Sequence, residues 1–592
     1  MQLTEKVLNE MNEVIEDCLA DEPPYCQARC PLDIDVQGYI TLVRDGKYKE
    51  AIRLIREKTI FPGILGRVCA HPCEEECKRG ELEEALSIKN LKRFAADMAD
   101  DPADWDLSRE PETEKKIAVI GAGPAGAVAA YNLQKKGHQV SIFEQLPEVG
   151  GMLRVGIPAY RLPHDVIDYE YSILEKLGVE INLNTEIGKD IDFEKLTEDF
   201  DAVFVAAGAH EGIMIPIDGA DLEGTIIAAD FLRDAALGNE VDIGKKVVVI
   251  GGGNVAMDAA RTAWRLGAEE INVSCLETGD QIPAHSWEIE DAEEEGIIMN
   301  PGWGPKVIKG EEKVEGITLK KCEQVFDSEG NFNPEYCEDN LKEIEADTII
   351  FAIGQRAEDS FAENTEVELN QTDEVTLQSQ QDNVFVGGDC KGTPLLAVEA
   401  MAHGRKAAIS IDRYLKNEDL YVERENEGAY ETKLEKEIDP EEPVRRRVDM
   451  RMIDLEERKN NFNEVELGFN IAEAKGESLR CLECECKECV KDCLMLEKYC
   501  DSPKALFQEV IDVGIDPLVY YSCNMCSQCT LVCPQEFELK DRFMDLRKIA
   551  VKENNGESPI EGHKAIKWHQ RLGFSKFFTT TQPASNNEED SK

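Results

Sequence analysis

Ten cysteines gather in one stretch near the end of the chain, at short and regular spacings. The most regular run is Cys523-x2-Cys526-x2-Cys529-x3-Cys533, followed directly by Pro534. In bacterial ferredoxins three cysteines at such steps hold one [4Fe–4S] cluster, and the fourth ligates a neighbouring cluster. A zinc ribbon also uses Cys-x2-Cys pairs, but a closed zinc site needs only four ligands. The cysteines therefore favour a pair of clusters that carry single electrons.

The partner run lies upstream and can be read in two ways, as Cys481-x2-Cys484-x4-Cys489-x3-Cys493 or as Cys486-x2-Cys489-x3-Cys493. In either reading Cys493 joins the downstream trio, and Cys533 joins the upstream cysteines. We take the first reading as the expected ligand set, while the choice between Cys484 and Cys486 stays open.

The middle of the chain holds a strand, a glycine-rich turn and a helix in succession. After an apolar strand that begins at Lys116, the turn reads Gly121-Ala122-Gly123-Pro124-Ala125-Gly126. Gly121 permits a tight turn, Gly123 lets the backbone approach a pyrophosphate, and Gly126 allows close packing of helix and strand. Glu144 ends the next strand about 20 residues later, where a carboxylate accepts hydrogen bonds from a ribose. Together these features predict a dinucleotide site.

The same pattern returns after the strand that begins at Lys246, in the run Gly251-Gly252-Gly253-Asn254-Val255-Ala256. The strand after its helix leads to Glu277, and no arginine follows before Arg356. A 2′-phosphate calls for arginine, whereas an acid accepts hydrogen bonds from a free ribose and repels phosphate. The second site is therefore predicted to bind NADH rather than NADPH. Two such sites in one chain are typical of FAD and a nicotinamide arranged for hydride transfer.

Composition excludes several classes of partner. The 592 residues include 120 acidic and 66 basic side chains, for a net charge of −54. Nucleic acids and anionic membranes require basic surfaces, so neither is expected as a partner. No apolar run is long enough to cross a bilayer, and we expect no membrane insertion. With 20 cysteines at ligand spacings and no secretory signal, we expect a cytoplasmic protein.

Changes in composition divide the chain into segments. We expect an α/β protein in which two Rossmann-like domains are flanked by helical, ferredoxin-like domains. The predicted divisions are an N-terminal iron–sulfur domain at 1–112, an FAD domain at 113–240 and 350–422, an NAD domain at 241–349, a linker at 423–470, a C-terminal ferredoxin-like domain at 471–578 and a disordered tail at 579–592.

The motifs and their order resemble the glutamate synthase small-subunit family, which includes the flavin subunit of NADH-dependent ferredoxin:NADP oxidoreductase and the N-terminal half of dihydropyrimidine dehydrogenase. The resemblance rests on the segments 150–163, 251–258 and 384–389. It implies that the FAD domain is interrupted by the NAD domain, and that the flavin contacts include Gly151, Arg154, Arg161, Gly388 and Asp389. The last cysteine-rich segment resembles ferredoxin domains of heterodisulfide-reductase-type proteins.

The resemblance also implies two [4Fe–4S] clusters near the N-terminus. The first would be held by Cys18, Asp21, Cys26 and Cys77, with Asp21 where the family has a cysteine. An aspartate that caps a helix is the alternative for Asp21. The second would use Cys30, Cys69 and Cys73, without an evident fourth ligand. Lys92 lies where relatives have Gln or Glu, and a charged lysine cannot ligate.

We therefore expect an NADH-linked FAD and iron–sulfur subunit of a larger oxidoreductase, with about four [4Fe–4S] clusters. Its partners would be other oxidoreductase subunits or ferredoxin, in a hetero-oligomer. No side chain stands out as a catalytic acid or base, because the chemistry belongs to the cofactors. The alternatives are the small subunit of an NAD(P)H-dependent glutamate synthase and a non-enzymatic electron relay. The direction of electron flow and electron bifurcation at the flavin stay open.

Overall fold

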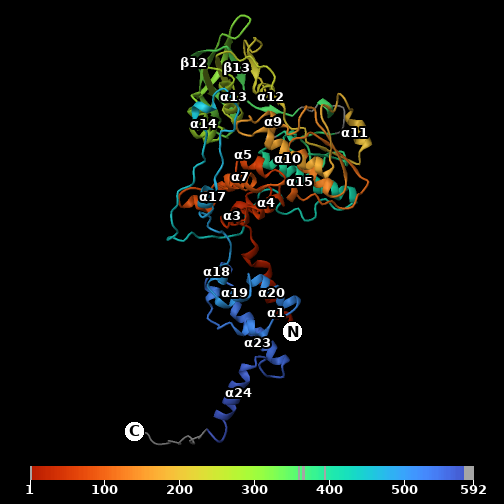
Figure 1. The fold of residues 1–592 in the computed structure, drawn as a ribbon, viewed down its shortest axis with the longest axis vertical. Helices are drawn as coiled ribbons and strands as arrows, with labels where there is room; N and C mark the ends of the chain where they lie inside the picture. The colour runs from red at the N-terminus through yellow and green to blue at the C-terminus, as the bar shows by residue number, and fades with distance from the viewer. Residues whose placement is uncertain (1–2, 358–359, 363–366, 393–394, 579–592) are drawn as a thin grey trace. The chain divides into compact units, whose positions relative to one another are not determined.

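The computed structural model describes residues 3–357, 360–362, 367–392 and 395–578. The predicted tail at 579–592 lies outside them. The chain forms two compact units (Figure 1). The smaller unit comprises 1–24, 432–442 and 483–592, and the larger comprises 25–431 and 443–482. The segment predicted as one N-terminal domain is thus divided, because its first 24 residues belong with the C-terminal unit.

The first nucleotide fold of the larger unit is built on a parallel sheet. Its strand order is β15 (Val384–Val386), β4 (Ala202–Val205), β1 (Lys116–Ile120), β2 (Gln139–Phe143) and β3 (Glu180–Asn182). The helices α8 (Pro124–Lys135) and α15 (Ala397–Lys416) pack closely, since a Cβ on Gly404 would lie 2.2 Å from the Ala125 carbonyl oxygen. Because β15 returns to this sheet after the second fold, the first fold is discontinuous, as expected.

The second nucleotide fold has a parallel sheet in the order β6 (Thr225–Ile227), β13 (Thr348–Phe351), β7 (Lys246–Ile250), β8 (Glu270–Cys275) and β9 (Ile298–Pro301). Since β6 pairs with β13, this fold already includes residue 225, upstream of the predicted boundary at 241. Its helices are α12 (Ala228–Ala236), α13 (Asn254–Arg265) and α14 (Ser286–Glu294). An antiparallel sheet adds β10 (Trp303–Lys309), β11 (Gly316–Phe326) and β12 (Phe332–Glu345).

The chain crosses between the two folds twice. The crossing segments pair as the short antiparallel strands β5 (Glu211–Gly212) and β14 (Gln355–Arg356). They follow β4 of the first fold and β13 of the second within a few residues. The two crossings are therefore hydrogen-bonded to each other.

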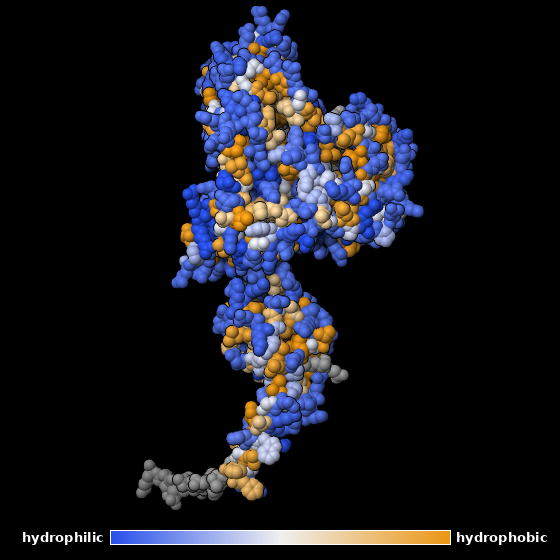
Figure 2. All heavy atoms as spheres, viewed as in Figure 1, coloured by the Kyte–Doolittle hydropathy of each residue, from blue (hydrophilic) through white to orange (hydrophobic). Residues whose placement is uncertain are grey.

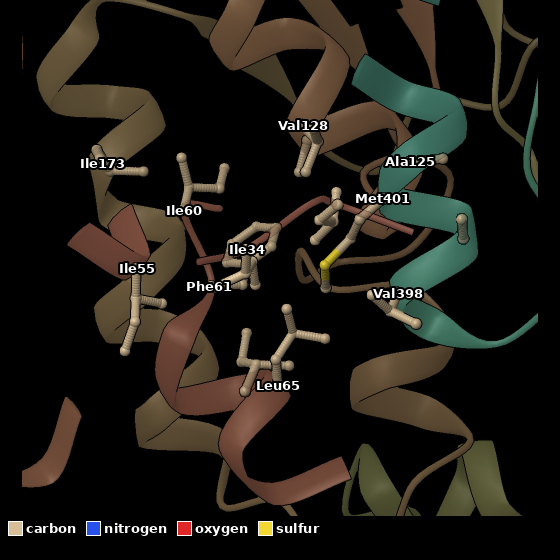
Figure 3. Close-up of a cluster of buried hydrophobic side chains, with 14 of the residues drawn as sticks. Ile34, Ile55, Ile60, Phe61, Leu65, Ala125, Val128, Ile173, Val398 and Met401 are labelled. Carbon is tan, nitrogen blue, oxygen red and sulfur yellow. The ribbon is translucent and has the colours of Figure 1, made fainter. Parts of the chain in front are cut away.

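A helical layer covers the first nucleotide fold. It contains α3 (Val36–Arg44), α4 (Tyr48–Arg56), α5 (Pro62–Val68), α7 (Ile88–Ala99) and α17 (Ile471–Ser478). Figure 3 shows its buried side chains Phe61 and Leu65 in the same cluster as Val128 of α8 and Met401 of α15. One continuous core thus joins the helical layer to the nucleotide fold.

The smaller unit is a bundle of short helices. It holds α1 (Glu5–Asp17), α18 (Glu488–Lys491), α19 (Leu494–Tyr499), α20 (Pro503–Asp512), α21 (Pro517–Tyr521), α22 (Gln528–Leu531), α23 (Leu539–Glu553) and α24 (Gly562–Gly573). Met11 and Val14 of α1 are buried in its core with Phe507 and Phe543. Apolar side chains of α24, such as Trp568, are exposed, and so is Phe574 directly after the helix. The face of the molecule drawn in Figure 2 is mostly hydrophilic, with smaller orange and tan patches. No helix in the described ranges has the length and apolar character needed to cross a membrane.

A buried carboxylate fastens the helical layer to the first nucleotide fold. Glu170 lies on α10 (His164–Leu177), and its carboxylate accepts hydrogen bonds from the backbone N–H groups of Gly63 and Ile64 at 2.6 and 2.9 Å. These donors open α5, where the helix dipole favours negative charge. Burial nevertheless raises the pKa of Glu170 to about 7. The side chain satisfies two backbone donors that would otherwise be buried without partners.

We expect Glu170→Ala to lower the free energy of unfolding by about 1–3 kcal/mol, because it leaves those two buried donors unpaired. Thermal unfolding followed by circular dichroism measures the effect. Glu175→Ala, at an exposed position of the same helix, is the matched control and should be close to neutral. Equal melting temperatures for the two variants would contradict this role.

Candidate functional site

One cavity of about 590 Å³ in the larger unit brings the two glycine motifs together. Gly123 and Glu144 line it from the first nucleotide fold, and Asn254 lines it from the second. Cys69, from the helical layer, reaches the same cavity. A predicted cluster ligand therefore shares one hollow with both predicted nucleotide sites.

The first glycine motif forms a cradle that side chains would fill. Gly121 has φ +100°, and a Cβ there would lie 2.4 Å from the Ala206 carbonyl oxygen. A Cβ on Gly126 would lie 2.1 Å from the carbonyl oxygen of Gly121. A Cβ on Gly123, in contrast, would meet no protein atom within 4 Å, and it would stand at the start of α8. Open space before a helix N-terminus suits a pyrophosphate.

Most of the other predicted flavin contacts line the cavity, but Arg154 does not. Pro124, Ala125, Gly151, Gly388 and Asp389 line the cavity with Gly123. The Glu144 carboxylate accepts hydrogen bonds from the backbone N–H groups of Ala122 and Leu146 at 2.7 and 2.8 Å, and burial raises its pKa. Arg154 does not line the cavity. Its guanidinium donates to the Val149 carbonyl and pairs with Asp168, so it holds the loop that carries Gly151.

The second glycine motif has the same local geometry. Gly251 has φ +145°, and a Cβ there would lie 2.2 Å from the Ala352 carbonyl oxygen, whereas a Cβ on Gly253 would meet nothing within 4 Å. Val255 lines the cavity beside Asn254, and Ala256 is buried in α13. Glu277 follows β8, and its Oε2 would lie 3.2 Å from a Cβ on Gly252. The carboxylate of Glu277 thus stands beside the glycine turn.

Arg161 joins the two nucleotide folds. Its guanidinium donates to both carboxylate oxygens of Asp258, at 2.8 and 2.6 Å, and pairs with Glu288 at 2.5 Å. Burial raises the pKa of Asp258 to about 6, while the charge of Arg161 opposes that rise. Although Arg161 lines the cavity, its charge is matched by side chains of the second fold. The sequence gives no signal for Glu288 in this role.

An aromatic stack closes another side of the cavity. The rings of His285 and Trp287 stack at 4.3 Å, and the ring of His71 lies 4.8 Å from Trp287. His71 is two residues beyond Cys69, and its backbone N–H donates to the Cys69 sulfur at 3.4 Å. Sequence reasoning missed these aromatic residues, because isolated His and Trp residues carry no motif.

Three cysteines of the larger unit lie around a buried lysine. Cys30, Cys69 and Cys73 are buried, and so is Lys92. Burial raises the pKa of Cys73, and the ammonium of Lys92 opposes that rise, as it does at Cys30. Cys26, Cys77 and Cys481 pack against the same core. Cys481, expected in the C-terminal ligand set, thus belongs to the larger unit.

Eight of the ten cysteines of the smaller unit form two groups of four. Cys18, Cys486, Cys489 and Cys533 line one small hollow. The charges of Cys493, Cys523 and Cys526 act on Cys529, whose pKa is raised first by burial. Neither Cys481 nor Cys484 lines the hollow. The cysteines of the upstream run that line it are therefore those of the second reading, which begins at Cys486, and not those of the first reading, which begins at Cys481. Cys18 lies with these cysteines, whereas its expected partners Cys26 and Cys77 lie in the larger unit.

Asp21 is not placed as a ligand. Its side chain is 68% exposed, and its carboxylate pairs with Lys504 at 3.0 Å. In the described ranges, no three His, Cys, Asp or Glu side chains converge on the position of a single metal ion. A [4Fe–4S] cube spaces its thiolates more widely than a tetrahedral zinc ion, whose sulfurs lie about 3.8 Å apart. Thiols around a small hollow are the donors that such a cube takes.

Two protein families match two segments of this chain. The pyridine nucleotide-disulphide oxidoreductase family matches residues 115–404, and the dihydropyrimidine dehydrogenase domain II 4Fe-4S family matches residues 4–103. The chain is 39% identical to the NADP(+)-dependent formate dehydrogenase subunit beta of Moorella thermoacetica, over 78% of this chain and 70% of that protein.

Two further relatives are similar over most of their length. The NADPH-Fe(3+) oxidoreductase subunit beta of Geobacter sulfurreducens is 34% identical, over 78% of this chain and 75% of that protein. The NADPH glutamate synthase small chain of Halomonas elongata is 33% identical, over 67% of this chain and 89% of that protein. The relatives named as subunits beta thus match more of this chain than the glutamate synthase small chain does.

Proposed function

Because the chain belongs to the family of FAD- and pyridine-nucleotide-dependent iron–sulfur oxidoreductase subunits, we propose that it passes electrons from NADH to a partner subunit or ferredoxin. The chain is an oxidoreductase with FAD and iron–sulfur domains. One observation carries the finer proposal. Both glycine motifs and Cys69 line a single cavity.

The first glycine motif would hold FAD. The open helix N-terminus at Gly123 would face its pyrophosphate, and Glu144 would accept hydrogen bonds from its ribose. Asp389 and Gly388 lie across the same cavity, where Asp389 accepts a hydrogen bond from the Leu395 N–H at 3.1 Å. When bound, FAD exchanges hydride with a nicotinamide and single electrons with iron–sulfur clusters. The residues of the chain position the cofactor and shield it from water.

The second motif would hold the nicotinamide dinucleotide, and Glu277 would select NADH. Relatives carry names with either NADP or NAD. We expect the preference between the two nucleotides to depend on residues beside the second glycine turn. The Glu277 carboxylate stands beside Gly252, where a 2′-phosphate would meet like charge. A free ribose would instead donate hydrogen bonds to it.

Electrons would leave through the cysteine-bound clusters, of which we propose about four. Cys69 lines the cavity. Cys30 and Cys73 lie near Cys69, because all three cysteines act on the buried ammonium of Lys92. We propose that the partners that accept these electrons are further oxidoreductase subunits or ferredoxin in the cytoplasm. The relatives named as subunits beta support a multi-subunit assembly.

Gly123→Ala should weaken FAD binding at least about tenfold, because the added methyl group fills the space at the helix N-terminus where the pyrophosphate would bind. The protein itself should tolerate the change, since no atom lies within 4 Å of the added Cβ. Flavin released by denaturation, measured per mole of protein, gives the result.

Gly253→Ala is the matched control for that experiment, because its Cβ also meets no protein atom. It should keep FAD but slow reduction of the flavin by NADH. Full FAD content in Gly123→Ala would contradict the assignment of the first site.

We also expect at least a tenfold lower KM for NADH than for NADPH, because Glu277 repels a 2′-phosphate. Glu277→Gln should narrow that ratio mainly by improving the KM for NADPH. Asp280→Asn, an exposed acid in the same loop, should leave the ratio unchanged. Equal KM values for both nucleotides in the unmodified protein would refute the proposed preference.

A further inference from the structure

The small hollow in the smaller unit unites four cysteines from distant parts of the chain. Cys18 follows α1, Cys486 and Cys489 come from the upstream run, and Cys533 ends the downstream run. Apolar side chains, among them Leu19, Phe537 and Leu539, complete the wall. The cysteines therefore share a small pocket with an apolar wall.

All four cysteines belong to the smaller unit, although more than four hundred residues separate Cys18 from the other three. Their shared lining of the hollow places Cys18 in one group with Cys486, Cys489 and Cys533.

The sequence of the upstream run explains why a distant cysteine is needed. The downstream run has cysteines at 523, 526, 529 and 533, and the same steps counted back from Cys493 fall on 489, 486 and 483. Position 483 is Glu483, so the upstream run lacks the first cysteine of the ferredoxin motif. Because Cys493 is assigned to the downstream trio, the cluster of the upstream run would have only three cysteines, Cys486, Cys489 and Cys533. Cys18 is the fourth in the hollow.

Helix α1 is held in place to present Cys18. Thr4 caps the helix, and Val7, Met11 and Val14 are buried in the core of the unit. Arg542 of α23 pairs with Glu10 and Glu13 of α1, each at 3.5 Å. Cys18 itself is the C-terminal cap residue, and its backbone N–H donates to the Val14 carbonyl at 3.1 Å. The position of the thiol is thus fixed by packing along the whole helix.

We propose that Cys18, Cys486, Cys489 and Cys533 together ligate one [4Fe–4S] cluster, so that the N-terminal segment completes a ferredoxin-like site. This inference rests on the proposal that the smaller unit binds clusters. The remaining group, Cys493, Cys523, Cys526 and Cys529, supplies the second cluster of that unit. Cys18 is then not a ligand of an N-terminal cluster with Cys26 and Cys77.

The test compares iron content and EPR spectra of the full-length reduced protein and its variants. Cys18→Ala should lose about a quarter of the iron, or convert one cluster to a [3Fe–4S] form, while FAD content stays unchanged. Cys500→Ala is the matched control. Cys500 lies in the same unit outside the hollow, and its thiol donates to the Leu496 carbonyl at 3.5 Å, so its loss should leave iron unchanged.

A second variant separates ligation from folding. Cys18→Ala combined with Glu483→Cys returns a cysteine to the vacant motif position and should restore iron and the EPR spectrum. Iron retained at the unmodified level in Cys18→Ala would overturn the assignment. A loss that the double variant does not restore would assign Cys18 to helix packing and would also overturn it. Absence of iron from the smaller unit of the unmodified protein would instead refute the proposed function.

Discussion

The buried ion pairs of Arg161 hold the two nucleotide folds face to face. Its guanidinium is shared by Asp258 and Glu288, which come from the other fold, and all three lie at the cavity. Removing one partner of a buried ion pair costs about 3–5 kcal/mol, because the remaining charge is left without compensation. Next to it, the guanidinium of Arg265 lies 3.7 Å from the centre of the Tyr160 ring. Hydride transfer would need the two nucleotide folds to be this close, since the flavin and nicotinamide rings would have to meet in one cavity.

The helical layer also contributes to the wall of this cavity. The core that runs from Phe61 to Val128 and Met401 makes the helical layer and the first fold one body. Cys69 caps α5 at the edge of that core, which brings a predicted cluster ligand to the wall of the cavity. Glu170 fixes the other end of α5 through two backbone hydrogen bonds. The hydrogen bonds of Glu170 at the start of α5 therefore help to fix Cys69 at the end of the same short helix.

Sequence reasoning predicted well what depends on local backbone geometry. The turns at Gly121 and Gly251 could be recognised because each needs a positive φ and close approach to a neighbouring strand, which only glycine permits. The interrupted order of the folds followed from the resemblance and is confirmed by the pairing of β15 with β4. The grouping of the cysteines could not be recovered in this way. Spacing identifies neighbours along the chain, but Cys18 joins residues more than four hundred positions away through the packing of α1.

Charge pairing across domains was equally hidden from the sequence. Arg161 was predicted to contact flavin from its motif, yet its partners Asp258 and Glu288 are decided by how the two folds dock. Arg154 was predicted in the same way, and its guanidinium contacts the Val149 carbonyl and the Asp168 carboxylate. A motif fixes which residue is present, and tertiary packing decides which group it meets.

Anaerobic titration of the full-length protein with NADH, followed by optical absorbance and EPR together, shows whether electrons pass from the nucleotide sites to the clusters. We expect NADH to bleach the flavin absorbance and the EPR signals of reduced [4Fe–4S] clusters to rise with it, without any added mediator. If NADH fully reduces the flavin while every cluster stays oxidised, the shared cavity does not connect the nucleotide sites to the cysteines.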